Sequence, residues 1–122
     1  MDLTQITKTL VSEIKLTENQ AKIFLHIVIH GRMNTTQISN DLHISFDDAT
    51  QNSKKLVELG GFIDMPNDEF EAMHPRFTAV NMYRKMCERE QKEFKKNLDI
   101  DNIGVALEVS YDDARTKYNK KK

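Results

Sequence analysis

The chain has 122 residues, of which 39% are hydrophobic and 30% charged, and its formal net charge is −1 at pH 7. This length suits one compact domain with its own core and excludes two domains of usual size, while the composition excludes a wholly disordered chain. The single cysteine excludes an intrachain disulfide and a cluster of thiolate metal ligands.

The hydropathy pattern predicts no membrane-spanning segment, so we expect no membrane among the partners of the chain. The longest apolar run, Ile23 to Ile29, is interrupted by His26 and is far shorter than the roughly 20 residues of a membrane-spanning helix. Residues 1–4 also lack the basic and apolar stretches of a signal peptide. We therefore expect a cytoplasmic protein.

The first two predicted elements are helices. Apolar residues recur at three- and four-residue steps over residues 2–15, which indicates an amphipathic helix capped by Asp2. Thr17 and Gln20 then form a capping box for a second helix, which runs to His30 and stops at Gly31. This second helix is apolar almost all round, so we expect it at the centre of the core.

Two shorter helices and a hairpin follow. Asn34 with Gln37 predicts a helix over residues 35–42, and Ser45 with Asp48 caps another that ends at Gly60. Two short helices joined by a tight turn are the helix-turn-helix pattern. Turn residues 65–69 separate two short β-type segments within 62–73, which predicts a hairpin, or wing, directly after the third helix of the unit.

The last third of the chain predicts further helices. Apolar residues at helical spacing indicate one long, partly exposed helix over 79–98, followed by a short helix near residues 100–109 and another beginning at Ser110. The long helix lacks enough of its own domain to lie on, so a second copy is expected to cover it. We expect a homodimer held by residues 2–15 and 79–98, through Leu3, Ile6, Leu10, Met82, Tyr83, Met86, Phe94 and Leu98.

The predicted fold is mainly α with a small β-hairpin. Residues 1–76 are expected to form a winged helix-turn-helix domain with an N-terminal helix, and residues 77–122 a C-terminal helical dimerisation extension.

Several segments in this order resemble one protein family. The run from Leu16 to Leu25, the stop at Gly31, Ile38, the Ile44-Ser45 turn and the run from Leu56 to Ile63 are together similar to the archaeal TrmB-type transcriptional regulators. The family opens with a similar Leu-Thr-x-x-x-Ala-x-x-x-Leu pattern, and the resemblance covers about residues 10–75. It implies a winged helix-turn-helix regulator that binds double-stranded DNA as a dimer, as do the related MarR and ArsR groups.

In such a fold the amino end of the helix that follows Ser45, the third helix of the winged unit, enters the major groove. Helical winding places Asp47, Gln51 and Lys54 outward, so Gln51 is suited to adenine and Lys54 to guanine or phosphate. The alternative is an ordinary solvated face. The full set of candidate DNA contacts is Arg32, Asn34, Thr35, Thr36, Ser45, Asp47, Thr50, Gln51, Lys54, Lys55 and Arg76.

The charge balance of this region favours a second hypothesis. Residues 32–76 contain four basic and eight acidic residues, and the hairpin segment has acids but no base at its tip. Phosphate affinity comes mainly from Lys and Arg. The alternative function is an acidic winged-helix module that docks a basic protein of the transcription machinery, with weak or no DNA binding.

No pattern in the sequence predicts enzyme chemistry. The sequence contains no Gly-rich phosphate-binding loop, no arrangement of Ser, His and Asp typical of a catalytic triad, and no paired-carboxylate site. His26 and His30 have a spacing that suits a metal, but no third ligand is identifiable, so packed or surface histidines are favoured. We expect no catalytic residue, no metal and no cofactor.

Overall fold

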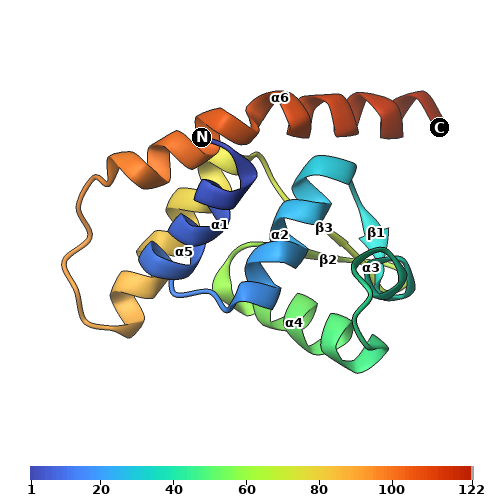
Figure 1. Ribbon diagram of the computed structural model, residues 1–122, viewed down its shortest axis with the longest axis horizontal. Helices are drawn as coiled ribbons and strands as arrows, with labels where there is room; N and C mark the ends of the chain where they lie inside the picture. The colour runs from blue at the N-terminus through green and yellow to red at the C-terminus, as the bar shows by residue number, and fades with distance from the viewer. Residues whose placement is uncertain (122) are drawn as a thin grey trace.

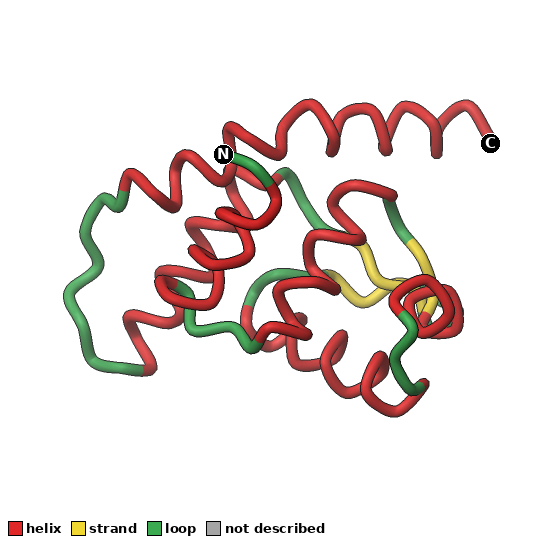
Figure 2. Tube along the Cα trace, viewed as in Figure 1, coloured by secondary structure: helices red, strands yellow, loops and turns green. Residues whose placement is uncertain are grey.

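The computed structural model describes the backbone of residues 1–121 and the side chains of residues 1–117. It is mainly helical, with one small antiparallel sheet (Figures 1 and 2). In chain order the elements are α1 (Leu3–Glu13), α2 (Glu18–His30), β1 (Met33–Asn34), α3 (Thr35–Leu42), α4 (Phe46–Leu59), β2 (Ile63–Met65), β3 (Glu69–Glu71), α5 (Pro75–Arg89) and α6 (Leu98–Lys121).

The predicted helix starts are confirmed at α1 to α4. Asp2, Thr17 and Asn34 each accept a hydrogen bond from the backbone N–H three residues on, and the glutamine at that position bonds back to the cap amide. Ser45 accepts from the N–H of Asp48 without the return bond. Each cap satisfies a backbone donor that the first turn of a helix leaves unpaired, so four helix boundaries follow from local chemistry.

The predicted hairpin is confirmed, and it belongs to a larger sheet. Strands β2 and β3 pair with Asp64 opposite Phe70, while β1 pairs along the other side of β3 with Met33 opposite Phe70, so the strand order is β1-β3-β2. Asn67 and Asp68, in the turn between the paired residues Met65 and Glu69, both have positive φ angles, which asparagine and aspartate adopt more readily than most residues. The sequence did not predict β1, because a two-residue strand leaves no alternating pattern.

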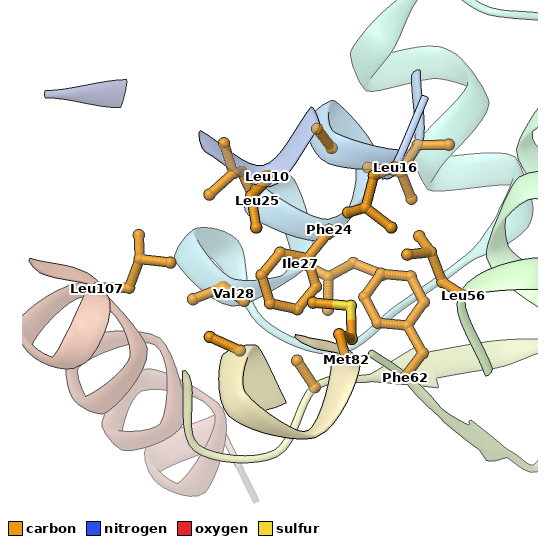
Figure 3. Packing of buried hydrophobic residues seen from close by; sticks show 14 of the residues in the cluster. Leu10, Leu16, Phe24, Leu25, Ile27, Val28, Leu56, Phe62, Met82 and Leu107 are labelled. Carbon is orange, nitrogen blue, oxygen red and sulfur yellow. The ribbon is translucent and has the colours of Figure 1, made fainter. Parts of the chain in front are cut away.

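Helix α2 lies at the centre of the molecule, as predicted (Figure 1). Ile23, Phe24 and Ile27 on it are at most 1% exposed. Figure 3 shows Leu10 of α1, Leu56 of α4, Met82 of α5 and Leu107 of α6 converging on this helix. Core residues from both sides of residue 76 therefore belong to one hydrophobic cluster.

Two predictions about the last third of the chain are wrong. Helix α5 ends at Arg89 and a loop follows to Asn97, so Phe94 and Leu98 do not share a helix with Met82. Residues 98–121 form one helix with Ser110 in its interior, so no helix begins at Ser110. Asp112 and Asp113 point into solvent there, and acidic side chains in water need no cap geometry.

The predicted dimer contacts require correction at four positions. Ile6, Leu10, Met82 and Met86 are between 0 and 2% exposed within the single chain, so they are unavailable to a second copy. The reason is that α6 folds back over α5 and α2 and supplies the covering surface that the sequence analysis assigned to a partner (Figure 1). Leu3, Phe94 and Leu98 remain exposed, while Tyr83 is partly buried against the ring of Phe94.

The packing of α6 against α5 depends on a small residue. A Cβ atom added at Gly104 would lie 2.6 Å from the Cα atom of Arg76, so only glycine permits this approach.

Within the described part of the chain, no helix combines the length and apolarity needed to cross a membrane.

Candidate nucleic-acid interface

Helix α4 divides into a buried and an exposed face. Ala49, Ser53 and Leu56 are fully buried against the core. Asp47, Gln51, Lys54 and Glu58 lie on the opposite side and are exposed. The α-helical period of 3.6 residues produces this division, which is why the sequence predicted which residues of α4 face outward.

The exposed side of α4 is nearly balanced in charge. Asp47, Asp48 and Glu58 oppose Lys54 and Lys55, and Lys55 Nζ lies 3.3 Å from Glu58 Oε2. Such exposed pairs contribute little to stability, so Lys55 stays available to another anion. Lys54 is exposed and has no ion pair among the described residues.

Thr50 and Ser45 use their hydroxyl groups within the chain. Thr50 Oγ1 donates to the Phe46 carbonyl oxygen at 2.9 Å, and Ser45 Oγ accepts from the Asp48 N–H at 3.0 Å. Ser45 is exposed and keeps its own O–H as a donor. The Thr50 hydroxyl donates its proton within the helix, so to an outside partner Thr50 offers a hydrogen-bond acceptor and a γ-methyl group but no donor.

The start of α3 offers fewer donors than the sequence predicted. Thr36 is exposed, but Thr35 is only 4% exposed, so its predicted role as a DNA contact is wrong. Asn34 accepts from the Gln37 N–H at 2.9 Å in its capping box. Thr35 is the first residue of α3 and follows directly on β1, whose Met33 is also buried.

The two predicted arginine contacts lie in different places. Arg32 Nε donates to Glu69 Oε1 at 2.7 Å, which ties the end of α2 to the hairpin. Arg76 pairs with Glu108 of α6 at 3.1 Å. Helices α6 and α4 lie on opposite sides of α2 (Figure 1), so Arg76, a predicted DNA contact, lies away from the exposed face of α4.

One exposed residue of this surface was not predicted from the sequence. Phe46, the first residue of α4, is 53% exposed although it is aromatic. Its place next to the Ser45 cap was visible in the sequence, and an aromatic residue at a helix start outside the apolar repeat was the available signal.

A polar cluster lies away from this surface, between α2 and α3. His26 Nε2 is 2.8 Å from Asp41 Oδ2, and the His26 and His30 rings are 4.6 Å apart. Partial burial lowers the pKa of His30, the charges of His26 and Lys117 lower it further, and Asp41 opposes them. Among the residues that the structure describes, no three His, Cys, Asp or Glu side chains are arranged to hold a metal ion.

Similarity to known proteins gives no further guidance. No protein-family model matches the sequence, and comparisons with curated proteins and with solved structures returned no significant match.

Proposed function

We propose that the chain is a winged helix-turn-helix protein that binds double-stranded DNA, with α4 in the major groove. The observation that carries the proposal is the exposed face of α4, which follows α3 after a tight turn and precedes the hairpin β2–β3. In proteins with this order of elements, the second helix of the pair reads base edges and the hairpin flanks it. Gln51 then faces adenine and Lys54 faces guanine or phosphate.

The charges around α4 support weak, salt-sensitive binding. Of the bases proposed as phosphate contacts, Arg32 is partly buried in its pair with Glu69, and Arg76 lies beside Glu108 of α6, away from α4, so Lys54 and Lys55 supply most of the attraction at α4. Asp47 and Asp48 oppose it. A second copy doubles the number of contacts, which makes a dimer important for affinity.

The outer face of α6 supports a dimer by a different route from the predicted one. Ile100, Ile103 and Leu107 on the inner face are buried, whereas Leu98, Val105 and Val109 on the opposite face are 66%, 54% and 70% exposed. Steps of seven and four residues place these three side chains in one stripe, the spacing of a coiled-coil seam. We therefore propose that α6 of a second copy covers this stripe.

The acidity of the surface favours one other candidate, a module that docks a basic protein of the transcription machinery. Asp47, Asp48, Asp64 and Asp68 are exposed on α4 and the hairpin, and the hairpin between Ile63 and Glu71 contains no base. Acidic surfaces of this kind attract basic partners and repel phosphate.

A salt series distinguishes the two candidates. We expect fluorescence anisotropy with random-sequence duplex to show binding at low salt that weakens steeply as salt rises, because counterions are released from neutralised phosphates. Lys54→Ala should weaken binding to all sequences. Binding that is undetectable even at low salt would refute the DNA proposal and leave the protein-docking function.

The location of the interface is tested by removing acids. Asp47→Asn with Asp48→Asn should raise duplex affinity and steepen its salt dependence if new phosphate contacts form, since two charges that repel phosphate are removed. The matched control is Glu88→Gln with Glu90→Gln, an exposed acidic pair at the carboxyl end of α5. Equal effects of the two pairs would show that α4 does not face DNA.

A further inference from the structure

Phe46 and Thr50 form an apolar contact surface on α4 beside Gln51. They are four residues apart and therefore neighbours on the helix. Phe46 is 53% exposed, and the Thr50 hydroxyl is bonded to the Phe46 carbonyl oxygen at 2.9 Å. This bond uses the Thr50 O–H, and the Thr50 γ-methyl and the Phe46 ring are the two groups that can make apolar contacts with a partner.

The position of this surface relates it to base recognition. In the first two turns of α4, Phe46 and Thr50 lie on one flank of the outward face that carries Asp47 and Gln51. In the major groove, phenylalanine rings and threonine methyl groups contact the C5-methyl of thymine, and glutamine pairs with the N6 and N7 atoms of adenine. Both kinds of group therefore favour A·T pairs.

The charge of the same turn supports an apolar partner at Phe46. Asp47 and Asp48 follow it directly and are exposed, so a phosphate is disfavoured next to the ring. The uncharged methyl of a base edge carries no such penalty. The chemistry around Phe46 therefore fits a groove floor better than a DNA backbone.

We propose that Phe46 and Thr50 read thymine methyl groups, so that the chain prefers A·T-containing sites in the major groove. This inference rests on the proposed DNA-binding function. It specifies which chemical feature of the DNA is recognised, and it gives the uncharged side chain of Phe46 a role in binding.

Replacing thymine with uracil tests the proposal, because uracil lacks only the methyl group. We expect wild-type protein to bind an alternating A·T duplex more tightly than the matching A·U duplex, by about fourfold for each methyl contacted. Phe46→Ala should bind the A·T duplex more weakly and lose most of the difference between the two duplexes. This loss of difference is the expected sign of a direct contact.

Phe77→Ala is the matched control. Phe77 is 52% exposed on α5, so the substitution removes an equally accessible ring from another helix. The control should keep the wild-type preference for thymine, and circular dichroism should show all three proteins folded.

The outcomes separate this inference from the function on which it rests. If wild-type protein binds duplex DNA but does not distinguish thymine from uracil, the methyl-reading role is wrong and the DNA-binding function stands. If it binds none of these duplexes, both fail, and Phe46 with its flanking acids becomes a candidate protein contact. Equal preferences in wild type and Phe46→Ala would also overturn the role of Phe46.

Discussion

At the scale of single residues, His30, which lies beside His26, is expected to make the stability of the fold depend on pH. Its pKa is lowered chiefly by partial burial, and the nearby charges of His26 and Lys117 add to that effect against Asp41. The folded protein therefore binds a proton at His30 less readily than the unfolded chain does. Above the ordinary histidine pKa of about 6.5, His30 is neutral in both states and the fold keeps its full stability. As the pH falls below this value, the unfolded chain binds a proton at His30 first, so the free energy of unfolding decreases.

We therefore expect the free energy of unfolding to decrease between about pH 7.5 and pH 5.5, and to decrease less in His30→Gln. Urea unfolding of both proteins at the two pH values measures this difference. Identical decreases would show that His30 does not contribute to the pH dependence.

At the scale of single elements, the caps explain why the helices begin where they do. The cap bonds of α1 to α4 span three residues and involve no distant contact. The Ser45 cap is the most informative because α4 carries the proposed interface. Its hydroxyl accepts the Asp48 N–H at 3.0 Å, and no return bond from a side chain supports it.

Ser45→Ala should lower the free energy of unfolding by about 1 kcal/mol, because the Asp48 N–H loses its acceptor. Ser12→Ala is the control, since Ser12 lies inside α1, where alanine has the higher helix propensity. Urea unfolding curves measure both. A loss in the control as large as that in Ser45→Ala would argue against the cap as the cause.

At the scale of the whole molecule, α6 has two apolar faces with different roles. The inner face completes the core of the chain, and the outer face carries Leu98, Val105 and Val109 in the open. The proposed dimer uses the outer face alone. It therefore predicts that the chain folds as a monomer when this face is blocked.

Val105→Glu with Val109→Glu should convert the dimer to a folded monomer, since like charges would meet across the seam. Met73→Glu is the control, as Met73 is 46% exposed between β3 and α5. Light scattering with circular dichroism measures mass and folding together. A wild-type protein that is monomeric at micromolar concentration, or a dimer that survives the double substitution, would contradict the proposal.

The sequence alone determined the features that depend on neighbouring residues. Helix starts at Asp2, Thr17, Asn34 and Ser45, the stop at Gly31 and the exposed side of α4 follow from caps and helical periodicity, which act over a few residues. For the same reason the outward positions of Asp47, Gln51 and Lys54 were predictable.

Only the tertiary structure decided the features that depend on contacts between distant segments. The pairing of Met33 with Phe70 creates β1, the folded chain leaves Thr35 only 4% exposed, and Arg76 lies beside Glu108 of α6 rather than beside α4. The return of α6 over α5 decides which apolar residues are core and which are exposed. An apolar repeat shows that a helix face is covered, but the covering chain segment is set by three-dimensional packing, which the repeat does not encode.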